Sequence, residues 1–232
     1  MVLSEEPDLG IPEQDRERQI LERILSLKQF IQVDGGEGRD YHELGICYYY
    51  LRNYDQAADY LDQIRLVEAD YPRLPMALGL QVLCLIETGD YPKALTTISL
   101  ALREFGDNEQ LLGMQAWCLD QSGQTAQAIE IHRRILQSNP ENLNSLNSLG
   151  YMLALRGADS DLQEAGLLLK RALQLKPGYP AYLDSFGLLL LKQGDSVKAR
   201  VAIQKALQQL PEHSEILAHL AQVLEADRTK QT

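Results

Sequence analysis

Three cysteines are the first residues to consider for chemistry, because thiolates bind metals and carry out redox reactions. Cys47, Cys84 and Cys118 follow one another at intervals of 37 and 34 residues. Each lies two residues after a small residue on a predicted helix. That small residue belongs to a sequence pattern that recurs along the chain, and later copies of the pattern carry an apolar residue in place of the cysteine. Equivalent neighbouring helices lie roughly 10 Å apart, too far to share a metal bound at about 2.3 Å. The spacing therefore favours cysteines that fill apolar packing positions.

The four histidines, His42, His132, His213 and His219, are likewise weak candidates for catalysis. His132 occupies a position where the other copies of the pattern carry Leu or Ile, so we predict that it packs in the interior. No second histidine follows His42 at the spacing of a zinc protease. The chain also contains no nucleophile elbow, phosphate-binding loop or dinucleotide fingerprint. We predict no catalytic residues, no metal site, no cofactor and no enzyme.

Composition limits the class of partner. The 232 residues carry a net charge of -11 and 45% apolar side chains, so the chain should fold, and it lacks the basic surface that nucleic acids require. A basic or amphipathic protein partner suits this charge better. No apolar run approaches the roughly 20 residues of a membrane span. The acidic start does not resemble a signal peptide, and widely spaced cysteines suit a reducing compartment, so the expected location is cytoplasmic.

The elements that would position any site come from an internal repeat. Small residues recur every 34 or 37 residues, at Gly45, Val82, Ala116, Gly150, Gly187 and Ala221. After each of the first five there is a turn, and then a second apolar segment of helical spacing that opens on an alanine: Ala57, Ala94, Ala128, Ala165 and Ala199. A hairpin of two such helices cannot bury its apolar face alone, so hairpins of this kind stack on their neighbours.

This pattern resembles the tetratricopeptide repeat (TPR) family over about residues 39–226, with five full repeats and the first helix of a sixth. The later repeats are similar to those of bacterial members. The resemblance implies an all-α fold, a right-handed α-solenoid of about five helix-turn-helix repeats with capping helices at both ends. It also implies a concave face lined by the first helix of each repeat.

The expected organisation is one domain with five parts. Residues 1–11 form a flexible lead, 12–34 an N-terminal capping helix, and 39–211 the five repeats. Residues 212–226 form a C-terminal capping helix whose Leu217, Leu220 and Leu224 point inward, and 227–232 form a flexible tail.

The concave face is the candidate site. On the first helices, the position just after the small residue is apolar in five repeats, and exposed apolar residues in register mark interaction surfaces. The predicted partner-binding residues are Ile46, Tyr49, Leu83, Trp117, Asn147, Tyr151 and Leu188. Gly79 and Gly113 lack side chains in mid-helix and should open room beside Leu83 and Trp117. The alternative is that these residues pack against the N-terminal helix or a neighbouring repeat.

The predicted function is non-catalytic: a scaffold or adaptor that binds a peptide or helix of a partner in the concave groove. Two alternatives remain open from the sequence. The chain is a self-associating structural protein, or it is a regulatory subunit of an enzyme complex.

Overall fold

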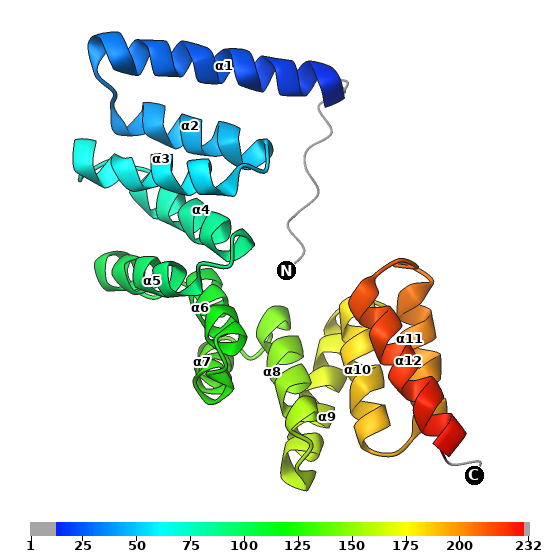
Figure 1. The fold of residues 1–232 in the computed structure, drawn as a ribbon. Coiled ribbons are helices and arrows are strands. Elements are labelled where there is room, and N and C mark those ends of the chain that lie inside the picture. The colour runs from blue at the N-terminus through cyan, green and yellow to red at the C-terminus, as the bar shows by residue number, and fades with distance from the viewer. Residues whose placement is uncertain (1–12, 230–232) are drawn as a thin grey trace. The chain divides into compact units, whose positions relative to one another are not determined.

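The computed structural model describes residues 13–229, and these are helical with no strand among them (Figure 1). The predicted flexible lead, 1–11, and the last residues of the predicted tail, 230–232, lie outside the described residues. The helices are α1 (Glu13–Asp34), α2 (Gly38–Tyr50), α3 (Tyr54–Val67), α4 (Leu74–Glu87), α5 (Tyr91–Phe105), α6 (Glu109–Gln121), α7 (Thr125–Ser138), α8 (Leu143–Arg156), α9 (Asp159–Leu175), α10 (Pro180–Lys192), α11 (Ser196–Leu207) and α12 (Ser214–Thr229). The helices from α2 to α11 form the five predicted pairs, and α12 is the sixth first helix.

The turn inside each pair is set by a residue in the left-handed backbone region. Gly89, Gly123 and Gly194 have φ values of 78°, 76° and 84°, which glycine adopts without a steric penalty. In the first repeat Arg52 takes this position with φ 55°. The next helix then begins at a capping side chain, as where Asp195 accepts a hydrogen bond from the Lys198 backbone N–H at 3.0 Å. These local signals hold the two helices of a pair in tight succession.

Close approach within a pair depends on a glycine that faces a large side chain. A Cβ added at Gly45 would lie 2.5 Å from Leu61, and one at Gly150 would lie 2.6 Å from Leu169. At Gly187 the distance to the Ile203 side chain would be 2.4 Å. In the first, fourth and fifth pairs, the small residue that defines the repeat in the sequence is therefore a contact point between the first and second helices.

The chain divides into two compact units, residues 1–114 and 115–232, with the boundary inside α6. In the first unit, α1 packs on α2 through Ile24, Leu27, Leu44 and Cys47. The Lys28 ammonium lies 5.3 Å from the centre of the Tyr48 ring and 5.5 Å from that of Tyr60, and the two rings stack on each other. A cation placed over aromatic rings contributes about 0.5–1 kcal/mol at an exposed site. The predicted N-terminal capping helix therefore has an electrostatic as well as an apolar anchor.

In the second unit, α12 packs on α10 and α11 with a different face from the predicted one. Leu217 and Leu224 are 43% and 42% exposed, while Ile216, His219 and Val223 are buried. Leu220 packs against the core as predicted. The prediction for Leu217 and Leu224 was wrong because an apolar pattern gives no weight to a buried histidine, and His219 turns the inward face of α12 by one residue. The helix also continues to Thr229, beyond the predicted end at 226.

The three thiols fill interior positions. Cys47, Cys84 and Cys118 are buried and unpaired by disulfides. Burial raises the pKa of the Cys84 thiol to about 12 and that of Cys118 to about 11. A thiol protonated at neutral pH is a poor nucleophile and a poor metal ligand, so the burial agrees with packing residues.

His132 also packs in the interior, as predicted, and its Nδ1 lies 3.1 Å from the Ser145 hydroxyl oxygen. Burial lowers the pKa of His132 from 6.5 to about 4. Between these values the unfolded chain binds a proton that the folded chain does not, so folding stability rises with pH across this window.

We expect acidification from pH 6.5 to 4 to remove about 3 kcal/mol of stability through His132. Urea unfolding of the wild type and of His132→Leu across this range measures the difference. The variant should lose less stability on acidification than the wild type, and equal losses would contradict a buried neutral imidazole.

Candidate partner-binding site

A groove of about 710 Å³ lies in the first unit, between α4, the end of α5, the α5–α6 connection and the start of α6. Its lining comprises Pro75, Met76, Gly79, Leu80, Leu83, Ala101, Phe105, Gly106, Asp107, Asn108, Gln110, Leu111 and Met114. All of these residues belong to the first unit. The size is within the range of pockets that hold small ligands or anchor side chains of a peptide.

Gly79 opens the middle of this groove. A Cβ added there would meet no atom within 4 Å, so nothing in the packing of the helix requires a glycine. A glycine inside a helix costs about 1 kcal/mol relative to alanine. The missing side chain instead leaves space beside Leu83, as the sequence predicts.

The groove is walled by adaptable apolar side chains. Met76 is 66% exposed at one edge and Phe105 is 44% exposed at another, whereas Leu80, Leu83 and Leu111 are half-buried along the floor. Methionine is flexible and polarisable and suits surfaces that accommodate different ligands. Large exposed apolar side chains beside a hollow are typical of interaction sites.

The α5–α6 connection fixes the far wall. The chain leaves α5 at Gly106, whose φ of 83° lies in the left-handed region. The Asn108 side chain then accepts a hydrogen bond from the Leu111 backbone N–H at 3.0 Å and caps α6. This turn sets Phe105 and Leu111 on either side of the connection.

Of the residues predicted in the first unit, Leu83 lines the groove. Ile46 and Tyr49 are half-buried on α2 and are not part of its lining. The Tyr49 ring contacts those of Tyr50 and Tyr54, and burial raises the pKa of Tyr49. Ile46 and Tyr49 therefore lie outside the groove, and Tyr49 belongs to an aromatic cluster with Tyr50 and Tyr54.

The predicted residues of the second unit differ in their environments. Trp117 on α6 is 38% exposed, and Asn147 and Tyr151 on α8 are half-buried. Leu188 on α10 is 1% exposed, so its side chain lies in the interior, where a partner does not reach it. The sequence spacing placed all of these on one face, but it does not show which of them neighbouring helices cover.

A polar cluster joins α8, α10 and α12 around Tyr151. The Tyr151 hydroxyl donates to a Glu215 carboxylate oxygen at 3.0 Å, and its ring centre lies 6.1 Å from that of His219. The His219 Nδ1 lies 2.9 Å from Asp184 Oδ2, with both side chains buried. Burial first, and then the Glu215 carboxylate, raise the pKa of Tyr151. The cluster ties α12 to the first helices of two preceding repeats.

Sequence reasoning missed Met76, Phe105 and Leu111. The prediction used fixed positions near the small residue of each first helix, whereas Phe105 ends a second helix and Leu111 follows the connection. A signal was present in Phe105-Gly106, where a large apolar residue directly precedes the glycine that ends the helix.

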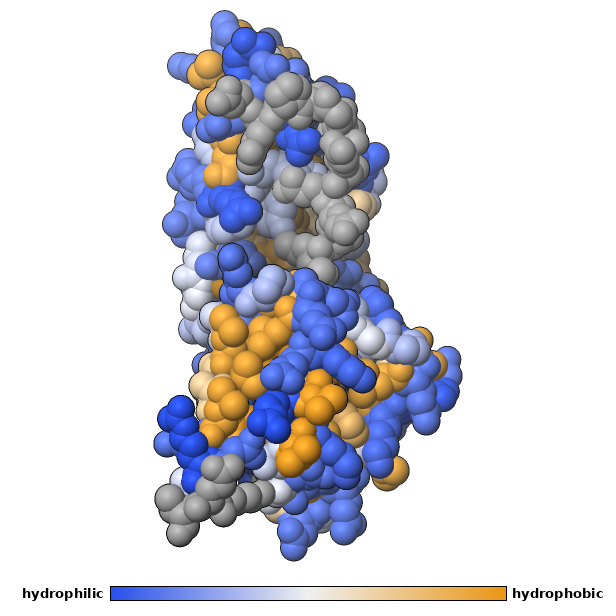
Figure 2. Space-filling model, turned by 90° about the vertical axis from the view of Figure 1, so that its right-hand side faces the viewer, coloured by the Kyte–Doolittle hydropathy of each residue, from blue (hydrophilic) through white to orange (hydrophobic). Residues whose placement is uncertain are grey.

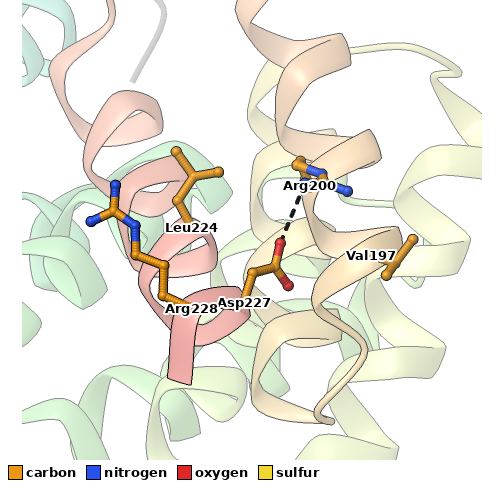
Figure 3. A pocket seen from close by; sticks show the side chains of 5 residues that line it. All are labelled: Val197, Arg200, Leu224, Asp227 and Arg228. Carbon is orange, nitrogen blue, oxygen red and sulfur yellow. Dashed lines mark ion pairs between the residues drawn. The ribbon is translucent and has the colours of Figure 1, made fainter. Parts of the chain in front are cut away.

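A second, smaller hollow of about 330 Å³ lies between α11 and α12 (Figure 3). The Arg200 guanidinium and the Asp227 carboxylate approach to 3.4 Å across it, with Val197 and Leu224 on either side. Exposed apolar side chains continue along these helices at Val201 and Leu217. Figure 2 shows hydrophobic surface, in orange, among hydrophilic residues on the side of the molecule that carries these helices.

In the described part of the chain, no helix has the length and apolar character needed to cross a membrane. Among residues 13–229, no group of three or more His, Cys, Asp or Glu side chains is arranged to hold a metal ion.

Known proteins are similar to this chain in sequence. A TPR repeat-containing protein of Pseudomonas aeruginosa is 33% identical over 171 residues, which are 72% of this chain and 28% of the relative. The chain thus spans a little over a quarter of that relative's length.

Two solved structures share the fold. A TPR protein with an unusual peptide-binding site, YrrB, aligns with a TM-score of 0.61, 18% identity, and coverage of 87% of this chain and 97% of its own. The APC/C hetero-tetramer Cut9–Hcn1 contains a chain with a TM-score of 0.71 and 16% identity, covering 92% of this chain and 41% of that one. Residues 42–109 and 114–180 match the tetratricopeptide repeat profile. This chain therefore belongs to the tetratricopeptide repeat family.

Proposed function

We propose that this chain is a non-catalytic interaction module whose first unit binds an apolar peptide or amphipathic helix of a partner in the α4–α6 groove. Tetratricopeptide repeats are in general protein-interaction scaffolds, and the similarity to a TPR protein with a peptide-binding site supports the finer proposal. The observation that carries it is the open glycine, Gly79, between the apolar walls of a groove.

In this groove, some residues contact the partner and another leaves room for it. Leu83, Leu80 and Leu111 offer an apolar floor that a partner's side chain covers, and burial of such a chain contributes roughly 1.5–3 kcal/mol. The gap at Gly79 accepts the backbone or a side chain of the partner. Ile46 and Tyr49, and in the second unit Trp117, Asn147 and Tyr151, remain predictions for contacts outside this groove.

Filling the gap is expected to block the groove without unfolding the protein. Peptides that bind the full wild-type chain are first selected from a displayed library of random 16-residue sequences. Fluorescence anisotropy should then show that these peptides bind Gly79→Leu at least tenfold more weakly than they bind the wild type. Gly113→Leu is the matched control. It is also a mid-helix glycine with no atom within 4 Å of an added Cβ, and it does not line the groove.

The control variant should bind these peptides as the wild type does, and circular dichroism should show that both variants are helical. If no peptide is enriched, or if the enriched peptides bind Gly79→Leu as well as they bind the wild type, the groove is not the binding site.

Self-association is a second candidate function, supported by the exposed apolar side chains of α11 and α12, such as Val197 and Leu224. A copy of the chain covering this surface would bury them. Light scattering across a hundredfold range of protein concentration tests this candidate. A mass that rises with concentration in the wild type but not in Leu224→Lys supports it, and a constant protomer mass rejects it.

A further inference from the structure

The net charge of the chain is confined to the unit that contains the groove. Residues 1–114 contain 10 Lys and Arg against 21 Asp and Glu, a net charge of -11. Residues 115–232 contain 12 of each, a net charge of zero. The acidity of this protein is therefore a property of the first unit and not an average over its surface.

The same sign of charge reaches the groove itself. The described lining residues include no Lys or Arg, and the charged one among them, Asp107, is acidic. Glu109 opens α6 directly beside it. At the end of α5, the Glu104 carboxylate is 2.6 Å from the Arg65 guanidinium, so this nearby arginine is already engaged by a carboxylate.

From this juxtaposition of an apolar floor and an acidic unit, we infer that the groove takes a basic amphipathic segment of a partner protein. The inference rests on the proposed function and names the chemical class of its ligand. Apolar side chains of the segment cover Leu80, Leu83 and Leu111, and its Lys or Arg side chains lie toward Asp107 and Glu109. Acidic segments and nucleic acids are repelled by the same field.

Complementary charge of this kind acts mainly on the rate of association and on specificity. Charges at the edge of a groove attract an oppositely charged segment over about 10 Å at 0.1 M salt, and less at higher salt. Binding should therefore weaken as salt rises, whereas contacts with the apolar floor should persist.

The test uses the random peptide library, which carries no bias in charge, and the full chain. Peptides whose binding depends on an open Gly79 should have a net positive charge. Replacing their Lys and Arg by Gln should weaken binding at least tenfold at 50 mM salt, with a much smaller loss at 500 mM.

Substitution on the protein side gives a matched control. Asp107→Asn/Glu109→Gln should weaken binding of the basic peptides about threefold to tenfold. Asp55→Asn/Asp59→Asn removes the same charge from α3, which does not line the groove, and should have a smaller effect. This inference is overturned if the peptides that need an open Gly79 are neutral or acidic, or if they bind the Asp107/Glu109 and Asp55/Asp59 variants equally well. Either result would leave the proposed groove in place. If the selected peptides bind Gly79→Leu as tightly as they bind the wild type, the proposed function itself is overturned.

Discussion

Replacing His219 by alanine is expected to lower the free energy of unfolding by about 3–5 kcal/mol, because it leaves the buried Asp184 carboxylate without its partner. The other oxygen of that carboxylate, Oδ1, is buried without a hydrogen-bond partner among the described residues. Without His219, neither oxygen of the Asp184 carboxylate would have a hydrogen-bond donor among the described residues. Urea unfolding of the full chain measures the loss, and hydrogen exchange of the α12 amides shows where it occurs.

The control is a double-mutant cycle. Asp184→Ala/His219→Ala removes both groups and should cost less than the sum of the two single variants, because no unpaired charge remains. Additive losses would show that the two side chains do not stabilise each other.

The same pair gives a pH dependence of known sign. The hydrogen bond to Asp184 is the largest cause that raises the pKa of His219 above 6.5, with the Asp184 and Glu215 charges adding to it and burial opposing it. The group's stabilisation is therefore complete below pH 6.5 and is lost as pH rises through the raised pKa. The free energy of unfolding of the wild type should therefore exceed that of His219→Ala by less and less as the pH rises above 6.5. The facing groups on the other helices are Asp184 on α10 and Tyr151 on α8, and Glu215 lies on α12 itself.

The second large effect is expected at Gly187. Alanine there is expected to lower the free energy of unfolding by about 1–3 kcal/mol, because its Cβ would lie 2.4 Å from Ile203 Cγ1 and 3.2 Å from the Ala199 carbonyl oxygen. Ile203 is fully buried, and a backbone carbonyl does not move easily, so the strain has little room to relax.

Gly113→Ala provides the comparison for Gly187→Ala. Both changes put alanine in a helix, which favours the folded state by about 0.5–1 kcal/mol when nothing clashes. The Gly113 variant should therefore be slightly more stable than the wild type in urea unfolding, and the Gly187 variant less stable. If Gly187→Ala also proves stabilising, the two helices are not in the tight contact described.

Much of the fold could be predicted because the same spacing of small residues and turns recurs in each of the repeats. Gly45, Gly150 and Gly187 are small for one geometric reason, and their spacing gives the helix pairs and the turns between them. His132 was recognised as a packing residue because four other copies show what its position holds. A single hairpin would have offered none of these comparisons.

The site could be predicted only in part, because burial depends on what covers a residue. Leu83 and Leu188 occupy equivalent positions, yet the first lines a groove and the second is in the interior. Equivalent spacing cannot separate them. Phe105 was missed for another reason, since it stands at a helix end outside the repeated positions. The inward face of α12 was predicted wrongly because one of its buried residues, His219, is polar and pairs with Asp184.

The glycine contacts have a consequence for how such sequences change over time. Gly45 and Leu61 share one volume, as do Gly187 and Ile203, and the members of each pair are 16 residues apart. Gly150 and Leu169 are 19 apart because α9 carries three extra residues at its start, before Leu169. A larger residue at one position is tolerated where a smaller one appears at the other. Inherited substitutions at these positions should therefore occur as linked exchanges of size, and the offset between the two positions shifts by the length of any insertion between them.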